Sequence, residues 1–157
     1  MRLEYFQLID RVVDLKLAER KISSEATVPM ASTIFEGHFP GYPLMPGVLL
    51  IEAMAQTSGW LLVALNRIQR MPFLAAVKEA KLRTFVTPGE RLSVDAHLIH
   101  DGSGYAMTEA AIRRDGKQIC DATITFRVIE FPNAEMAKMM LKTAAELGLK
   151  VEAPADG

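Results

Sequence analysis

Residues 41–66 form a long apolar run in which Glu52 is the only charged side chain. Runs of 18 or more apolar residues are candidates for a membrane helix. This run also contains a polar stretch at 56–59, and a carboxylate near the bilayer centre costs about 2.5 kcal/mol or more. A helix buried on nearly all sides of a globular fold has the same apolar composition. We therefore expect a buried central helix over about residues 46–67 and no membrane span.

The charge balance and the cysteine count exclude several classes of protein. The 157 residues contain 18 Lys and Arg against 19 Asp and Glu, which lacks the basic excess of a protein that binds nucleic acid through phosphates. The single cysteine, Cys120, excludes a disulfide framework and a cysteine-based zinc site, and it fits a reducing compartment. Glu4 and Asp10 interrupt the first ten residues, so we expect no export signal and a cytoplasmic location.

The rest of the chain has the patterns of short strands. Stretches of β-branched and alternating apolar residues, separated by turn residues such as Asp115-Gly116, predict six strands. These strands are expected at 5–14, 20–28, 73–85, 91–101, 104–114 and 117–128. An irregular segment is expected at 29–45, and a terminal helix at 133–147 that stops at Gly148. This order predicts an α+β fold in which a curved antiparallel sheet of about six strands wraps around one long central helix. Residues 1–130 would form this domain, with 131–157 as a helical extension rather than a second domain.

The stretch 37–56, GHFPGYPLMPGVLLIEAMAQ, groups residues that suit acid–base chemistry. The imidazole of His38 in a loop suits a general base near neutral pH. Gly47 in the first helical turn offers free backbone N–H groups where the helix dipole favours negative charge. Glu52 in an apolar helix would have a raised pKa and could donate a proton. Taken singly each residue has an ordinary structural explanation, but together they suit removal of a proton beside a carbonyl and loss of a β-hydroxyl.

The same twenty residues resemble the signature of FabZ-type (3R)-hydroxyacyl-[acyl-carrier-protein] dehydratases, which have the hotdog fold. The similarity extends to FQLIDRV near the N-terminus and to VKEAKLRTFVTPGE and DGKQICDATITF after the helix, and covers roughly residues 5–128. The resemblance implies that His38 is the catalytic histidine, Glu52 the catalytic acid and Gly47 the backbone donor to the thioester carbonyl. Glutamate rather than aspartate at position 52 favours dehydration without isomerisation. No metal or other cofactor is implied.

The resemblance also implies partners. The substrate would be a 3-hydroxyacyl chain linked through phosphopantetheine to an acyl carrier protein. The active unit would be a homodimer whose sites take the histidine and the acid from two subunits, or a trimer of such dimers. The EYFQLIDRV opening and the HDGSGY hairpin are similar to paralogues that serve the very-long-chain acyl groups of lipid A. The tail at 129–157 departs from the family pattern.

Two further residues and two rival functions remain open at this stage. Gln56, one helical turn after Glu52, either orients the Glu52 carboxyl group or is a polar residue at the dimer seam. Phe39 either lines an acyl tunnel or packs in the core. A hotdog protein of this kind could instead be an acyl thioesterase, or a non-catalytic module that binds acyl thioesters.

Overall fold

Helix α2, Gly47–Leu65, is the buried central helix that the apolar run predicts. The computed structural model describes residues 1–151. By length and composition α2 could cross a membrane, but 61% of its most apolar 18-residue window is buried inside the fold. Its hydroxyl groups find partners there: Thr57 pairs with Ser24 at 2.6 Å, and Ser58 accepts a hydrogen bond from Thr108 at 2.8 Å. These contacts identify α2 as a core helix.

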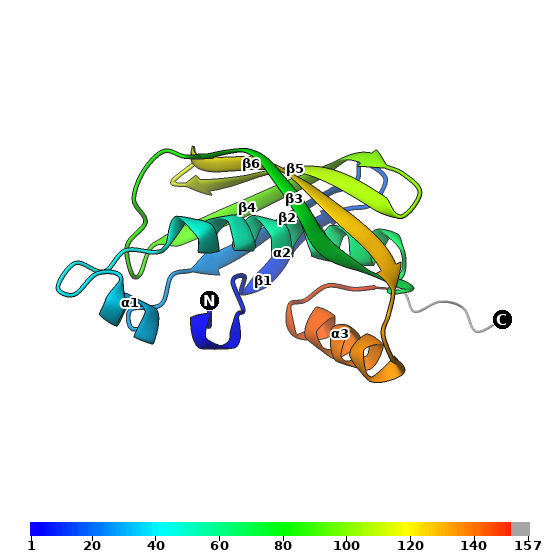
Figure 1. Cartoon of the computed structure of the whole chain (residues 1–157), viewed down its shortest axis with the longest axis horizontal. Coiled ribbons are helices and arrows are strands. Elements are labelled where there is room, and N and C mark those ends of the chain that lie inside the picture. The colour runs from blue at the N-terminus through cyan, green and yellow to red at the C-terminus, as the bar shows by residue number, and fades with distance from the viewer. Residues whose placement is uncertain (152–157) are drawn as a thin grey trace.

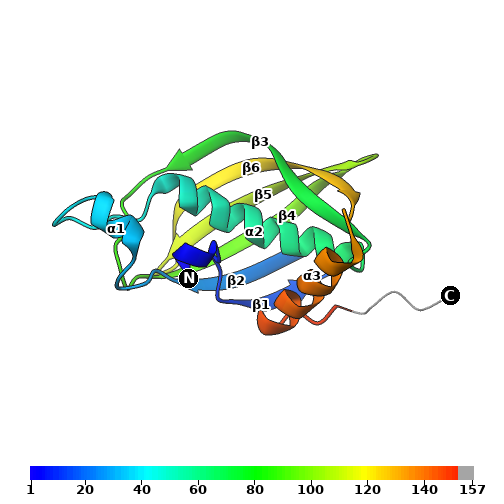
Figure 2. The same ribbon diagram turned by 60° about the horizontal axis from the view of Figure 1, so that its bottom comes forward.

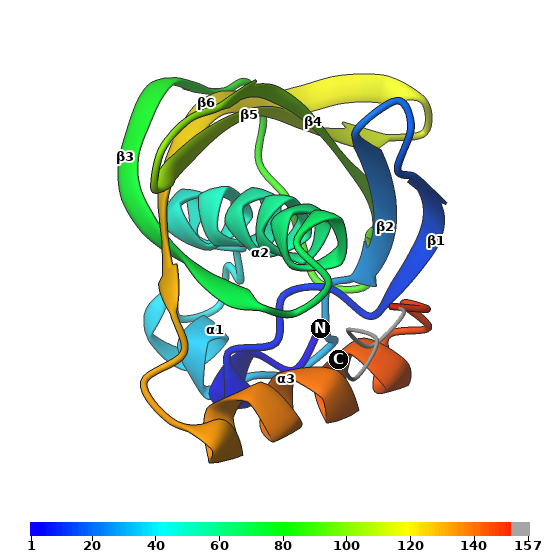
Figure 3. The same cartoon turned by 90° about the vertical axis from the view of Figure 1, so that its right-hand side faces the viewer.

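One six-stranded sheet wraps around this helix, as Figure 1 shows. The strands are β1 (Arg11–Lys16), β2 (Lys21–Thr27), β3 (Arg70–Leu82), β4 (Arg91–Asp101), β5 (Tyr105–Arg114) and β6 (Lys117–Glu130). Their spatial order is β1-β2-β4-β5-β6-β3, and every neighbouring pair is antiparallel. Figure 3 looks along α2 and shows the sheet curving over it from β3 to β1. This is the hotdog fold, and it confirms the predicted α+β class.

The alternation of buried and exposed residues shows which side chains form the inner face of the sheet. Every second residue in most of β2, β4 and β5 is buried against α2, as in the series Leu92, Val94, Ala96 and Leu98. The predicted turn between β5 and β6 is also present, with Asp115 and Gly116 both at positive φ. The register of the sheet therefore follows from its hydrophobic pattern and its turn residues.

The prediction for the first strand is only partly right. A 3-10 turn, η1 (Leu3–Tyr5), replaces its start, and β1 begins at Arg11. Leu8 and Ile9 are fully buried beneath α2, where the side chain of Gln56 bonds the backbone at Phe6 and Leu8. These tertiary hydrogen bonds hold the segment out of the sheet. Strand β3 likewise runs from Arg70 to Leu82 rather than over 73–85.

The segment expected to be irregular contains a short helix, α1 (Thr33–Gly37). The Ser32 side chain caps it by accepting a hydrogen bond from the Ile34 N–H. The carboxylate of Glu4 accepts hydrogen bonds from the Ser32 hydroxyl and the Thr33 N–H, which lower the pKa of Glu4 to about 2. The start of the chain is thus fastened to the helix that leads into His38.

The terminal helix, α3 (Ala134–Glu146), is also confirmed. The Asn133 side chain caps its start, and Gly148 at positive φ follows its end, where the Leu149 N–H bonds the Ala144 carbonyl. Figure 2 shows α3 beside the C-terminal half of α2, on the open side of the sheet. The last six residues of the expected extension, 152–157, lie outside the described residues.

Candidate active site

His38 directly follows α1 and is held at both its backbone and its ring. Its N–H donates to the Ile34 carbonyl at 3.0 Å, and its Nδ1 lies 2.9 Å from the Leu44 carbonyl oxygen. A carbonyl oxygen can only accept, so Nδ1 carries the hydrogen and Nε2 keeps its lone pair in the neutral ring. The Phe39 ring stacks on the imidazole, with centroids 4.1 Å apart. This arrangement leaves Nε2 available to take a proton.

Gly47 lies in the same cavity as His38, at the start of α2. We call this space, about 600 Å³ in volume, the His38 cavity; it is lined by His38, Phe39, Leu44, Met45, Gly47, Leu50, Leu82, Arg83, Thr84 and Phe85. Within residues 1–151, neither the Gly47 N–H nor the Val48 N–H has a hydrogen-bond acceptor. A Cβ at position 47 would lie 2.7 Å from Leu82 Cδ1, so only glycine fits without movement. The cavity therefore combines a proton acceptor with free amides at the positive end of a helix.

Glu52 lies farther along α2, half-buried in a second space. We call this space, about 410 Å³ in volume, the Glu52 groove; it is lined by Tyr5, Phe6, Gln7, Ile9, Glu52, Ala55, Gln56, Gly59, Trp60, Pro72, Leu74, Phe126, Met140, Thr143, Glu146 and Leu147. Burial raises the pKa of the Glu52 carboxyl group, and a hydrogen bond from the Gln56 side chain partly offsets that rise. Glu52 therefore keeps its proton to a higher pH than an ordinary glutamate does, which suits a proton donor.

Gln56 makes three hydrogen bonds that fix its orientation. Its Nε2 donates to Glu52 Oε1 at 3.1 Å and to the Phe6 carbonyl at 2.8 Å, while its Oε1 accepts from the Leu8 N–H at 3.0 Å. The predicted contact between Gln56 and Glu52 is therefore present. The backbone partners at Phe6 and Leu8 were not predicted, since no sequence pattern indicates that this segment crosses α2.

The five residues singled out from the sequence fall into two groups. His38, Phe39 and Gly47 line the His38 cavity, whereas Glu52 and Gln56 line the Glu52 groove, and the two spaces share no lining residue. Phe39 is 49% exposed, so it is not a core residue. No sequence pattern pointed to Leu82, which limits position 47, or to the residues of α3 that line the groove. The terminal helix was expected at 133–147, but its contact with the groove was not.

Comparison with known proteins places the chain in a family. Residues 2–123 match the model of the FabA-like domain. That match spans most of the chain, so the protein belongs to the FabA-like family.

Individual relatives agree with this placement. The chain is 38% identical over 122 residues to the 3-hydroxyacyl-[acyl-carrier-protein] dehydratase FabZ of Lactococcus lactis subsp. cremoris, with 77% of this chain and 83% of the relative aligned. It is also 38% identical to the bifunctional enzyme LpxC/FabZ of Chlorobaculum tepidum, where the match covers 82% of this chain but only 28% of the larger enzyme. A hypothetical thioesterase from Streptococcus pneumoniae, crystallised with coenzyme A, superposes with a TM-score of 0.61 over 78% of this chain and 88% of its own. At 14% identity that likeness concerns the fold alone.

Proposed function

We propose that this protein removes water from (3R)-hydroxyacyl-[acyl-carrier-protein] and releases the trans-2-enoyl thioester. The observation that carries the proposal is the chemical contrast between its two ionisable groups. His38 offers a free Nε2 beside unbonded helix amides, and Glu52 is a half-buried acid with a raised pKa. Relatives of high coverage are named for this dehydration.

The reaction divides between three groups. His38 Nε2 takes the proton from C2, and the electron pair of that C–H bond forms the C2=C3 double bond as the C3–O bond breaks. Glu52 protonates the departing hydroxyl group, which leaves as water. The Gly47 N–H donates to the thioester oxygen, where negative charge develops in the transition state. The proton on His38 then returns to the Glu52 carboxylate through solvent, which restores both groups.

One active site would take its residues from two subunits. Because the His38 cavity and the Glu52 groove share no lining residue, we place His38 and Gly47 of one subunit opposite Glu52 of its partner. Strand β3 supports a homodimer, since it lies at the sheet edge and leaves Phe73, Leu74 and Leu82 exposed. A trimer of dimers is the larger assembly in the same proposal, and sedimentation equilibrium distinguishes two copies of the chain from six.

The carrier protein would approach the His38 cavity. Arg83 lines this cavity and pairs with Asp121, and Lys81 lies two positions earlier, on β3. Carrier proteins of this type are acidic, and complementary charge speeds such encounters.

The free, buried Cys120 fits the proposed cytoplasmic location.

The proposal also covers domain limits and pathway. We take residues 1–130 as the dehydratase domain and 131–157 as its extension, because Ala144 and Leu147 are buried in the same core. The reaction belongs to fatty acid biosynthesis. The narrower expectation is that the protein acts on the very-long-chain acyl groups of lipid A. Measuring the acyl length that the protein accepts tests this expectation.

The decisive assay supplies 3-hydroxyacyl thioesters of graded length and measures enoyl thioester and free thiol in parallel. We expect enoyl product without thiol release, and His38→Ala and Glu52→Gln to lower the rate by about 10²–10⁴. Thiol release without enoyl product would instead identify a thioesterase. Thermal stabilisation by the thioester without any turnover would indicate a binding module.

A further inference from the structure

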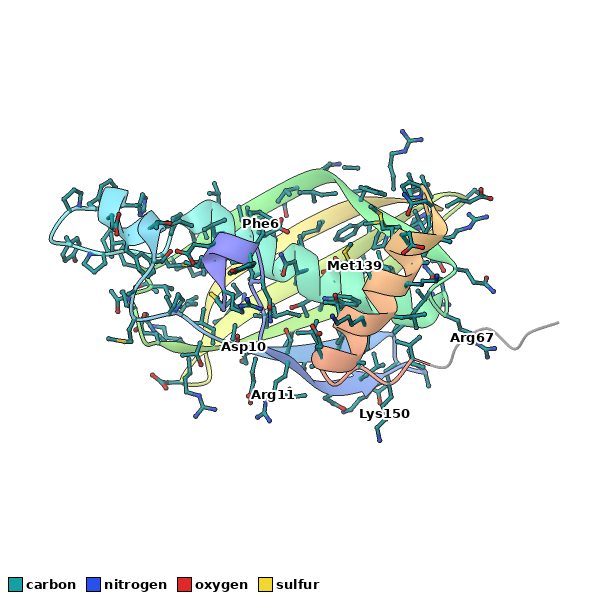
Figure 4. The ribbon with its side chains drawn as sticks, turned by 90° about the horizontal axis from the view of Figure 1, so that it is seen from below. Phe6, Asp10, Arg11, Arg67, Met139 and Lys150 are labelled. Atoms are coloured by element: carbon teal, nitrogen blue, oxygen red, sulfur yellow. The ribbon has the colours of Figure 1, made fainter. Side chains whose placement is uncertain are left out.

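The Glu52 groove extends along α2 from Glu52 to α3. The α2 residues that line it, at positions 52, 55, 56, 59 and 60, recur at helical spacing and share one face of the helix. Trp60 lies eight positions after Glu52, which corresponds to about 12 Å along the helix axis. Figure 4 views this face from below, with Phe6 of the N-terminal segment in front of the first part of α2 and Met139 of α3 in front of its later part. The groove is therefore a channel with Glu52 toward one end and α3 at the other.

The walls beyond Glu52 are largely apolar. Phe6 lines one side, while Pro72 and Leu74 of β3 line the other. Phe6 is 58% exposed and Leu74 is 50% exposed. Two large apolar side chains of the groove are therefore in contact with water. Glu146, the charged residue contributed by α3, has an exposed side chain 4.0 Å from Lys142. An unbranched hydrocarbon chain fits such a channel, because it needs apolar contact and no polar partner.

Helix α3 lines the far end of the groove and is firmly docked. Ala144, Leu147 and Leu149 are buried, and the Leu147 carbonyl accepts a hydrogen bond from the Val12 N–H of β1 at 2.8 Å. Met140 and Thr143 are one helical turn apart and both face the groove. The helix lies outside residues 2–123, the part that matches the family. This end of the channel is therefore built by the chain's own extension.

We propose that α3 is the end wall of the acyl pocket and that Met140 and Thr143 set the length of acyl chain this protein accepts. The proposal rests on the proposed function, since Glu52 would act at C3 and thereby fix where the chain enters. The carbons beyond C3 then run along α2, past Gly59 and Trp60, to the side chains of α3. A longer chain must displace Met140 or bend out of the groove.

Two variants change the end wall in opposite directions, and a neighbouring residue supplies the controls. Thr143→Phe narrows the channel, and Met140→Ala enlarges it. Met139 is 55% exposed and does not line the groove, so Met139→Phe and Met139→Ala are matched controls on the same helix. The substrates are (3R)-hydroxyacyl pantetheine thioesters from four carbons upward.

We expect Thr143→Phe to lower kcat/KM for the longest accepted substrates by roughly 10-fold or more, as lost pocket space does elsewhere. The four-carbon substrate should stay within about twofold of the wild-type value because it does not reach α3. Met140→Ala should shift the preference toward longer chains. Length profiles of Thr143→Phe and Met140→Ala that match those of the Met139 variants would overturn the proposal, while turnover of the four-carbon substrate would leave the proposed function intact.

A binding measurement tests the end wall without turnover. Trp60 is the only tryptophan of the chain, is 8% exposed and lines the groove, so its fluorescence reports an occupant. Acyl pantetheines with a terminal bromine should quench Trp60 in the wild type, and the longer ones should quench it less in Thr143→Phe but equally in Met139→Phe. Quenching without dehydration would reject the proposed reaction and keep the acyl pocket. Absence of quenching at any length would reject the pocket.

Discussion

The side-chain amide of Gln56 joins the Glu52 carboxylate, 3.1 Å away, to the backbone carbonyl of Phe6, 2.8 Å away. One residue of α2 therefore holds both a half-buried acid and the segment that crosses beneath the helix. The same amide lowers the pKa of Glu52, against the larger effect of burial. Changes at position 56 should consequently alter stability and proton transfer together.

Replacing Gln56 with leucine tests this link. The Gln56→Leu variant leaves the Leu8 N–H and the Phe6 carbonyl without a partner, so the free energy of unfolding in urea should fall by about 1–3 kcal/mol. The pKa of Glu52 should rise further, which moves the alkaline limb of the kcat/KM profile to higher pH. Gln7→Leu is the control, because within residues 1–151 the Gln7 side chain donates only to the Ile9 carbonyl, at 3.3 Å, and does not bond Glu52. An alkaline limb that does not move, or that moves equally in both variants, would contradict the link.

Glu52 should also make stability depend on pH. Its pKa in the folded state is raised above the ordinary value of 4.5, so the folded protein holds this proton more tightly than the unfolded chain does. The Glu52 contribution to stability is therefore greatest below pH 4.5 and is lost as pH rises through the folded pKa. Glu52→Gln stays neutral, so its stability relative to the wild type should increase from pH 4 to pH 7. Urea unfolding at both pH values measures this, and an unchanged or opposite difference would refute it.

The close contact between Gly47 and Leu82 predicts that Gly47→Ala lowers activity much more than it lowers stability. In Gly47→Ala the new methyl group would meet Leu82 Cδ1, the mobile end of a 46% exposed side chain. The free energy of unfolding should change by less than about 1 kcal/mol. Activity should fall roughly 10- to 100-fold, since displacements on the order of 1 Å disturb a catalytic site.

The double variant Gly47→Ala/Leu82→Ala removes that contact. Its kcat/KM should recover to the level of Leu82→Ala alone. If the double variant remains as impaired as Gly47→Ala, the contact with Leu82 is not the cause of the loss.

Buried hydroxyl pairs fasten α2 to the sheet, and a double-mutant cycle measures one of them. Ser24 and Thr57 are fully buried, with their oxygens 2.6 Å apart. Thr57→Val leaves the Ser24 hydroxyl with only a long contact to the Val94 carbonyl, at 3.5 Å, so unfolding should become easier by about 1–3 kcal/mol. Adding Ser24→Ala should cost less in the variant than in the wild type. Strictly additive costs would show that the pair does not interact.

The central helix and the turns could be predicted because their causes are local. In a soluble fold, an apolar run with one charged residue forms a helix that is buried on nearly all sides. Asp115 and Gly116 supply the positive φ angles that the hairpin between β5 and β6 needs. The start of the chain could not be predicted in this way. Residues 5–10 have the composition of a strand, but hydrogen bonds from Gln56, 48 residues away from Leu8, hold them under α2.

The residues of the site could be singled out for a similar reason, since they occur within one short stretch. Their distribution was expected only through the resemblance, which implies that one site takes the histidine and the acid from two subunits. No pattern of residues by itself indicates that His38 and Glu52 line separate spaces within one chain. Nor does any pattern indicate that α3 reaches the groove, because that contact joins segments about 90 residues apart.

The most direct measurement mixes two inactive variants. His38→Ala and Glu52→Gln are unfolded together in equal amounts and refolded, beside wild type and each variant alone treated in the same way. If each site takes His38 from one subunit and Glu52 from its partner, every mixed dimer has one intact site, and the mixture should recover about one quarter of wild-type dehydration. Activity no higher than the average of the two variants, with mixed dimers present, would contradict the shared site.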